Sequence, residues 1–116
     1  MGYMRDNAII VTGYYGEYID NAHKRAKKIF GEQVSEITPE ATNGARSFFV
    51  APDGSKEGWK ESNIGDENRE AFVKYLENRR YSDGSSPLNL VEVQYGDDEL
   101  ETKIINDSDE YRRNKR

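Results

Sequence analysis

The apolar residues near the start of the chain change from one spacing to another. Residues 7–12 are rich in β-branched side chains and polar residues do not alternate through them, which predicts a buried central strand. From residue 17 to residue 30 the apolar residues recur at helical spacing, and Gly31 stands where such a helix would end. The pattern therefore predicts a strand followed by an amphipathic helix.

The rest of the chain repeats these two kinds of segment. Residues 33–37 alternate between polar and apolar, and residues 46–51 and 88–95 are further predicted strands between turn residues. Asp66 is expected to cap a second helix, because carboxylates follow it in the first turn and apolar residues then return at helical spacing. The expected inward stripe of that helix is Phe72, Tyr75, Leu76 and Arg79.

The order strand, helix, strand, strand, helix, strand predicts an α+β fold of the ferredoxin-like βαββαβ type. Two helices would cover one face of an antiparallel sheet with strands in the order 4-1-3-2. Residues 101–105 are left open as an extra C-terminal hairpin strand, which makes residues 1–105 a single domain and residues 106–116 a charged tail expected to fray. The open sheet face of such a domain is often an interface, so a homodimer is an alternative to a monomer.

Composition narrows the classes of function. Seventeen Lys and Arg against 22 Asp and Glu give a formal charge of −5, which disfavours general nucleic-acid binding. The absence of Cys excludes disulfides, thiolate metal sites and cysteine nucleophiles. No apolar run approaches the roughly 20 residues of a membrane span, and the first residues lack a signal-peptide pattern, so we expect a soluble cytoplasmic domain.

The densest polar chemistry lies between the predicted third strand and the second helix. In a structural interpretation, Asp53 forms an Asx turn and Trp59 folds back on the core. In a binding interpretation, Trp59 offers a stacking face or anchor, while Lys56 and Arg69 meet an anionic group. The candidate ligand- or partner-binding residues are Asp53, Ser55, Lys56, Trp59, Asp66 and Arg69.

A metal-dependent interpretation of the same region would use carboxylates as ligands for Mg²⁺ or Ca²⁺. The residues concerned are Asp53, Asp66, Asp97 and Asp98, whose spacing matches no EF-hand. The prediction is accordingly that the chain has no metal site and no cofactor.

The tyrosines and the single histidine are two further candidates for chemistry. Tyr14, Tyr15 and Tyr81 are predicted to meet at the opposite end of the fold as a secondary aromatic patch, with core packing as the alternative. His23 is the only histidine and falls in the middle of the first predicted helix, where we expect it on the surface. It supports no Ser–His–acid arrangement, so we predict no catalytic residues and favour a protein that is not an enzyme.

Three segments, residues 47–59, 81–87 and 91–97, resemble parts of small uncharacterised proteins of tailed bacteriophages and prophages. The resemblance covers most of residues 7–105. It implies the cytoplasm of a bacterial host cell as the setting, and it supplies no activity or site that can be transferred to this chain.

Three functions remain open, in order of preference. The first is a non-catalytic binding protein that engages a host or phage protein, with counter-defence as one such role. The second is a protein that binds or sequesters a nucleotide or small anionic ligand. The third is a divalent-metal phosphoesterase.

Overall fold

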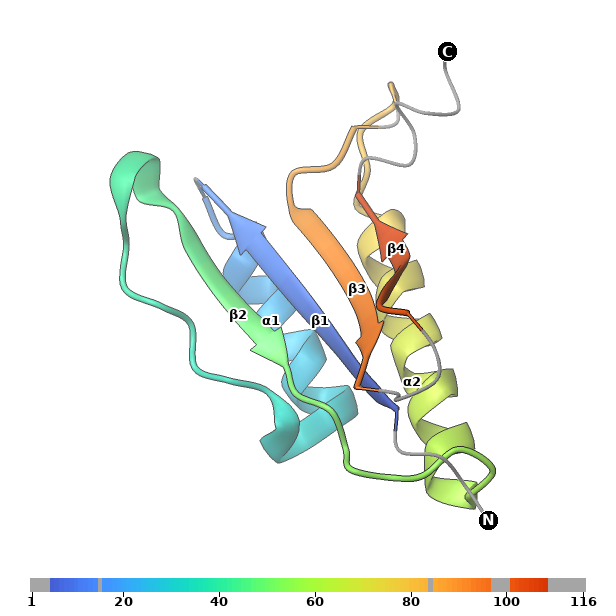
Figure 1. The fold of residues 1–116 in the computed structure, drawn as a ribbon. Coiled ribbons are helices and arrows are strands. Elements are labelled where there is room, and N and C mark those ends of the chain that lie inside the picture. The colour runs from blue at the N-terminus through green and yellow to red at the C-terminus, as the bar shows by residue number, and fades with distance from the viewer. Residues whose placement is uncertain (1–4, 15, 84, 97–100, 109–116) are drawn as a thin grey trace.

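The computed structural model describes residues 5–14, 16–83, 85–96 and 101–108. In chain order, its elements are β1 (Asp6–Gly13), α1 (Tyr18–Phe30), the 3₁₀ turns η1 (Gly31–Gln33) and η2 (Thr42–Gly44), β2 (Arg46–Val50), α2 (Lys60–Glu77), β3 (Asn89–Tyr95) and β4 (Lys103–Asp107). The four strands form one antiparallel sheet, and both helices lie on the same face of it (Figure 1). The prediction of an α+β fold with an antiparallel sheet and two helices is confirmed.

The strand order is β2-β1-β3-β4, so the first strand lies inside the sheet. Its neighbours are the predicted 46–51 and 88–95 strands, as the expected order required. The extra strand considered near the C-terminus is present as β4, which pairs with β3 and forms one edge of the sheet. It spans residues 103–107 instead of the expected 101–105.

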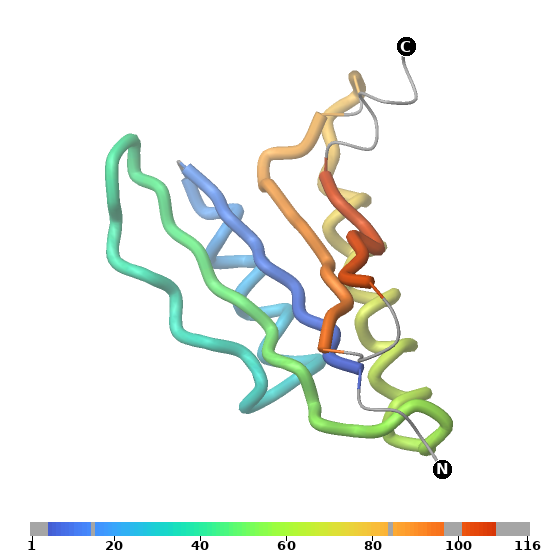
Figure 2. The backbone as a smooth tube through the Cα atoms, viewed as in Figure 1, coloured from blue at the N-terminus to red at the C-terminus, as the bar shows by residue number. Residues whose placement is uncertain are grey.

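The predicted strand at residues 33–37 is wrong as a regular strand. Residues 31–33 instead form η1, and the following segment joins β2 through an isolated bridge between Val34 and Val50. Separate backbone hydrogen bonds from Ser35 to Phe49 and from Thr38 to Ser47, both 2.9 Å, add to it without forming a regular ladder. Figure 2 shows this segment following the free edge of β2 as an extended chain. The carbonyl of Ser35 accepts a hydrogen bond from His23 Nε2 (2.9 Å), and the Phe49 N–H donates to the Ser35 hydroxyl (2.9 Å). Side chains thus make some of the bonds that a regular ladder would make between backbones. The ferredoxin-like assignment remains a prediction.

The core lies between the sheet and the two helices. Alternate residues of β1 and β2 pack there against the predicted stripe of α1, whose buried members are Ile19, Ala22, Ala26 and Phe30. Gly13 allows a close approach, because a Cβ there would lie 2.8 Å from Leu88 Cδ2 and 3.1 Å from Ile19 Cβ. The glycine thus serves helix–strand packing at the end of β1.

The second helix begins earlier than the sequence suggested. α2 starts at Lys60, so the prediction of Asp66 as its N-cap is wrong, and Asp66 lies inside the helix. Ser62 and Gly65 are buried on the inner side of this extra first part, which explains why a polar, glycine-containing stretch is helical here. The connection from β2 is correspondingly shorter than expected.

The described part of the predicted tail belongs to the sheet. β4 extends to Asp107, and Ser108 is buried. The Ser108 N–H donates to the Leu90 carbonyl (2.9 Å), and the Leu90 N–H donates to the Ser108 hydroxyl (3.0 Å). The expectation of fraying for residues 109–116 falls outside the described residues. Within the described chain, neither helix combines the length and the apolar character needed to cross a bilayer.

Candidate functional site

The loop between β2 and α2 has the turn that the sequence predicted. The backbone N–H and the hydroxyl of Ser55 both donate to Asp53 Oδ1, at 2.8 and 2.6 Å. Gly54 has a φ of 78° and Gly58 a φ of 90°, values that side-chain-bearing residues rarely adopt. Asp53 and Ser55 are therefore the residues that hold the loop in shape.

Trp59 at the start of α2 is not part of the core. Its side chain is 47% exposed, and the Lys56 ammonium lies 5.8 Å from the centre of its ring. The ring borders a hollow of about 350 Å³, which is also lined by Asp53, Ser55 and Arg69. An exposed aromatic ring beside a cation supports the binding interpretation of this loop over the structural one.

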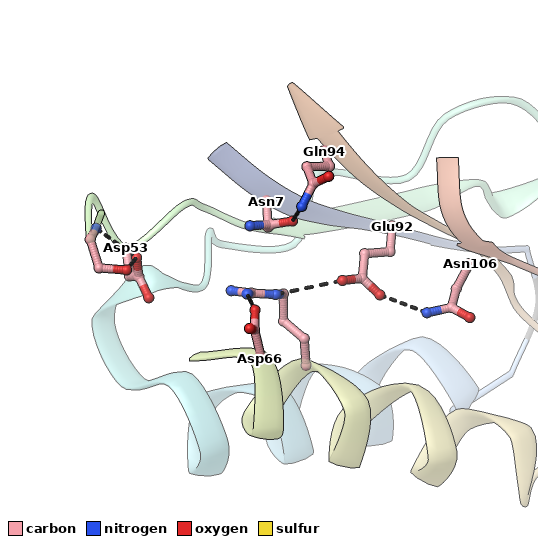
Figure 3. A network of polar contacts seen from close by, with 8 residues as sticks. Asn7, Asp53, Asp66, Glu92, Gln94 and Asn106 are labelled. Carbon is pink, nitrogen blue, oxygen red and sulfur yellow. Dashed lines mark hydrogen bonds and ion pairs between the residues drawn. The ribbon is translucent and has the colours of Figure 1, made fainter. Parts of the chain in front are cut away.

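Arg69 is buried, which removes it as a binding cation. Its side chain is 7% exposed and forms ion pairs with Asp66 and with Glu92, the latter at 3.5 Å between Nε and Oε2 (Figure 3). Gly65 leaves room for this arrangement, because a Cβ there would lie 3.1 Å from Arg69 Nη1 and 2.7 Å from Asp53 Oδ2. The guanidinium is thus neutralised by the protein's own carboxylates.

Glu92 is a buried carboxylate that sequence reasoning missed. Its side chain is 8% exposed, and it also accepts a hydrogen bond from Asn106 Nδ2 at 2.7 Å (Figure 3). Leu88, Leu90 and Glu92 lie at alternate positions, so the strand period places all three on the helix-covered face. That alternation was the available signal, and a buried Glu requires a partner such as Arg69.

The structure brings most of the predicted loop residues together, but Asp66 borders a different cavity from Asp53. Asp53, Ser55, Trp59 and Arg69 line one hollow, with Lys56 next to the ring. Asp66 instead borders a second cavity of about 430 Å³ with Arg69 and Glu92. The first hollow contains the carboxylates of Asp53 and Glu61. Of the two cations predicted for this site, Arg69 is neutralised by its ion pairs, so an anionic ligand there would have only Lys56 to contact.

The predicted aromatic patch of Tyr14, Tyr15 and Tyr81 stays a prediction. Tyr14 and Tyr81 are about half-exposed, and Tyr15 lies outside the described residues. Tyr81 forms a hydrogen bond with Tyr18, and this bond is the main reason that the pKa of the Tyr81 hydroxyl is raised above its usual value. Tyr18, the first residue of α1, is therefore the tyrosine that Tyr81 contacts.

The described residues contain no group of three or more His, Asp and Glu side chains placed to hold a metal ion. Asp53 and Asp66 border different cavities on the two sides of Arg69. Asp97 and Asp98, the other two candidate ligands, lie outside the described residues. The metal-dependent interpretation has no support in the described part of the chain.

The other sheet face, which carries no helix, presents a continuous apolar surface. It faces the viewer in Figure 1. Residues opposite one another in the register point to the same side of a sheet, so this open face can be read from the pairing. Its outward residues are Asp6, Ala8, Ile10, Thr12, Ser47, Phe49, Asn89, Val91, Val93, Tyr95, Ile104 and Asp107.

Large apolar side chains on the open face are well exposed. Ile10, Phe49, Tyr95 and Ile104 are between 37% and 65% exposed. A shallow hollow of about 560 Å³ lies over β1 and β2, with Ala8, Ile10, Phe49, Val93 and Tyr95 among its lining residues. The charged residues at outward positions of the described strands are both carboxylates. Sequence reasoning expected an interface on this face but named none of its residues.

Comparisons with protein-family models, with curated proteins and with solved structures gave no match. The resemblance to small phage proteins therefore stays a prediction. The function has to be argued from the geometry of the described surfaces.

Proposed function

We propose that this protein is a non-catalytic binding protein whose open sheet face docks a partner protein, encoded by the host or by a phage. The observation that carries the proposal is the continuous apolar surface formed by the four strands. The host or phage origin of the partner comes from the sequence resemblance alone.

An exposed apolar surface of this kind is typical of a binding site, because covering it removes apolar area from water. Soluble monomers seldom expose a large contiguous apolar patch without a function for it. Phe49 and Tyr95 offer aromatic side chains with few rotatable bonds, which are common anchors of protein interfaces. Four strands about 4.8 Å apart and about 20 Å long present roughly 400 Å² of sheet. Stable complexes bury about 800 Å² per partner, so the contact belongs to the transient class or extends beyond the sheet.

The charges on the open face favour a particular kind of partner. Asp6 and Asp107 are the charged residues at outward strand positions, so the described strands offer carboxylates and no cation there. A second copy of this chain packed face to face would add further carboxylates and no cation from the outward positions of the described strands. A different protein with an apolar centre flanked by Lys or Arg would complement both features. We therefore commit to such a basic-flanked partner rather than a homodimer.

The two other functions considered from the sequence find less support at the predicted loop site. A nucleotide or small anion at Trp59 would meet Asp53 and Glu61, while Arg69 is neutralised. A metal phosphoesterase would need a ligand cluster that the described residues do not provide.

Site-specific photocrosslinking tests the proposed docking surface. A photoreactive phenylalanine analogue replaces Phe49 in one variant and Trp59 in another, in bacterial cells that produce the tagged protein. The two positions are matched, because both side chains are aromatic and 47% exposed. We expect position 49 to give a discrete adduct with another protein, and an added Ile10→Asp substitution to abolish it.

The adduct has to meet a chemical criterion as well. The partner peptide crosslinked at position 49 should be apolar with flanking Lys or Arg, as mapped by mass spectrometry. An adduct of twice the chain's mass would show a homodimer and overturn the basic-flanked partner. Adducts only at position 59, or none at either position, would overturn the proposed docking surface.

A further inference from the structure

The groove between α1 and α2 collects positive charge in a chain that is acidic overall. It has a volume of about 370 Å³ and lies on the helix layer, away from the open sheet face. Its lining residues are Asn21, Lys24, Arg25, Lys28, Tyr75 and Arg79. Four of the six are cations and none is a carboxylate, although the whole chain has a formal charge of −5. We call this set the interhelical groove.

Tyr75 organises the two arginines of the interhelical groove. The guanidinium carbon of Arg25 lies 4.5 Å from the centre of the Tyr75 ring, and that of Arg79 lies 4.7 Å from it. The ring itself stacks on Phe72 of the core at 6.5 Å between centroids. Both guanidinium groups are thus held against an anchored ring, which reduces the entropy lost when they bind an anion.

The cations of the groove are not neutralised within the described part of the chain. Other basic residues of the same helices have acidic partners: Lys27 contacts Glu36 at 3.3 Å, and Lys74 contacts Glu70 at 3.0 Å. No such ion pair joins a groove cation to a described carboxylate. Asp20, whose pKa is lowered chiefly by its bond to Arg46 and less by the charge of Lys24, is held by Arg46 at 3.0 Å.

We propose that the interhelical groove is a binding site for a small anion that carries two or more phosphate groups. Paired guanidinium forks match phosphate oxygens with two parallel hydrogen bonds each, and lysine ammonium groups supply further charge. Four positive charges in one groove match a polyphosphate better than a single inorganic phosphate. The size of the groove suits a small ligand. This site is separate from the Trp59 loop and does not depend on the protein-docking function.

Binding of tripolyphosphate to the purified full chain, measured by isothermal titration calorimetry, tests the proposal. ATP, a short single-stranded oligonucleotide and citrate are the other arms. We expect tripolyphosphate and ATP to bind at low salt and citrate to bind more weakly. The paired substitution Arg25→Gln/Arg79→Gln should weaken binding at least about tenfold, because charge-assisted hydrogen bonds are lost.

A matched control separates the groove from the general charge of the helices. Lys27→Gln/Lys74→Gln also removes two positive charges, one from α1 and one from α2, at ion-paired positions. This control should bind tripolyphosphate within about twofold of the unaltered chain, since its side chains lie outside the groove. Circular dichroism confirms that each variant is folded.

Three results would overturn the proposal. One is no heat of binding for tripolyphosphate or ATP with the folded chain. Another is an equal loss of binding in the groove variant and in the control variant. The last is tight binding of the oligonucleotide alone, which would assign the groove to a nucleic-acid backbone instead of a small polyphosphate.

Discussion

The pairing of Arg69 with Glu92 is the clearest residue-scale feature of the structure. Both side chains are more than nine-tenths buried, and each makes a further polar contact, Arg69 with Asp66 and Glu92 with Asn106. Removing one member of a buried ion pair leaves the other charge uncompensated in a poorly solvated place. Replacing only one of the two residues should therefore destabilise the fold more than replacing both.

We predict that Arg69→Met lowers the free energy of unfolding by about 3 kcal/mol, because Glu92 is then buried without its cation. The double variant Arg69→Met/Glu92→Leu should recover much of that loss. Urea unfolding of the single and double variants measures both values. Lys74→Met breaks the exposed pair with Glu70 and should cost less than about 0.5 kcal/mol. Equal losses in Arg69→Met and the double variant would contradict this account.

At the same scale, the sequence predicted some residues well and missed others for a physical reason. Gly31 was predicted to end α1, and it does so with a φ of 63°. Local rules suffice there, because the backbone itself needs a glycine. The burial of Arg69 and Glu92 depends on a helix and a strand that are distant in sequence. Pattern reasoning treated Arg69 as an available cation because charged residues are usually exposed.

At the scale of elements, Arg46 joins the start of β2 to the start of α1. Its two terminal nitrogens donate to the two carboxylate oxygens of Asp20 at 3.0 and 3.1 Å, and one of them also donates to the Gly16 carbonyl at 3.2 Å. The bond from Arg46 is the main cause of the lowered pKa of Asp20. The first helix and the second strand are thus held together by a bidentate ion pair.

We predict that the ion pair between Arg46 and Asp20 makes the free energy of unfolding depend on pH in the acidic range. A carboxyl group with a lowered pKa in the folded state stabilises the protein above its unfolded pKa, and this contribution is lost as the pH falls through the folded value. Asp20→Asn should therefore be less stable than the unaltered chain near pH 7, and the gap should close below about pH 4. Thermal unfolding at several pH values measures the gap.

Glu70→Gln is the control for this prediction. Glu70 also pairs with a cation, but both side chains of that pair are about two-thirds exposed. Its stability gap should stay small at every pH. A gap for Asp20→Asn that widens as the pH falls would have the wrong sign and would contradict the role assigned to Arg46.

Element boundaries show where sequence patterns stop being sufficient. β1 follows a stretch rich in β-branched residues and α1 follows a clear helical period, and their predicted spans agree closely with the structure. The 33–37 segment has the alternation of a strand, but His23 and the Ser35 hydroxyl take part of its bonding capacity. α2 begins early because Ser62 and Gly65 pack on its buried side. Helix propensity does not include such tertiary packing.

At the scale of the whole molecule, two surfaces of different chemistry lie on opposite layers. The open sheet face is apolar with carboxylates at outward positions, while the interhelical groove on the helix layer carries four cations. The net charge of −5 conceals this division. Composition alone disfavoured nucleic-acid binding, and only the fold shows where apolar and cationic side chains gather. The proposed protein partner and the proposed small anion would therefore use separate surfaces.

Docking through the open face should also respond to salt in a defined direction. The apolar centre is insensitive to ionic strength, whereas attraction between a basic-flanked partner and the carboxylates is screened. We predict that raising salt from 50 to about 300 mM slows association of the partner crosslinked at position 49, with a smaller effect on its dissociation. Surface plasmon resonance measures both rates. Faster association at high salt would contradict the proposed charge complementarity.

Selection from a displayed random peptide library tests the docking surface most directly. The library is selected in parallel on the unaltered protein, on Phe49→Asp and on Trp59→Ala. We expect peptides with an apolar cluster flanked by Lys or Arg, retained by the unaltered protein and by Trp59→Ala and lost with Phe49→Asp. Peptides that Phe49→Asp retains and Trp59→Ala loses would overturn the proposed docking surface and place it at the loop before α2.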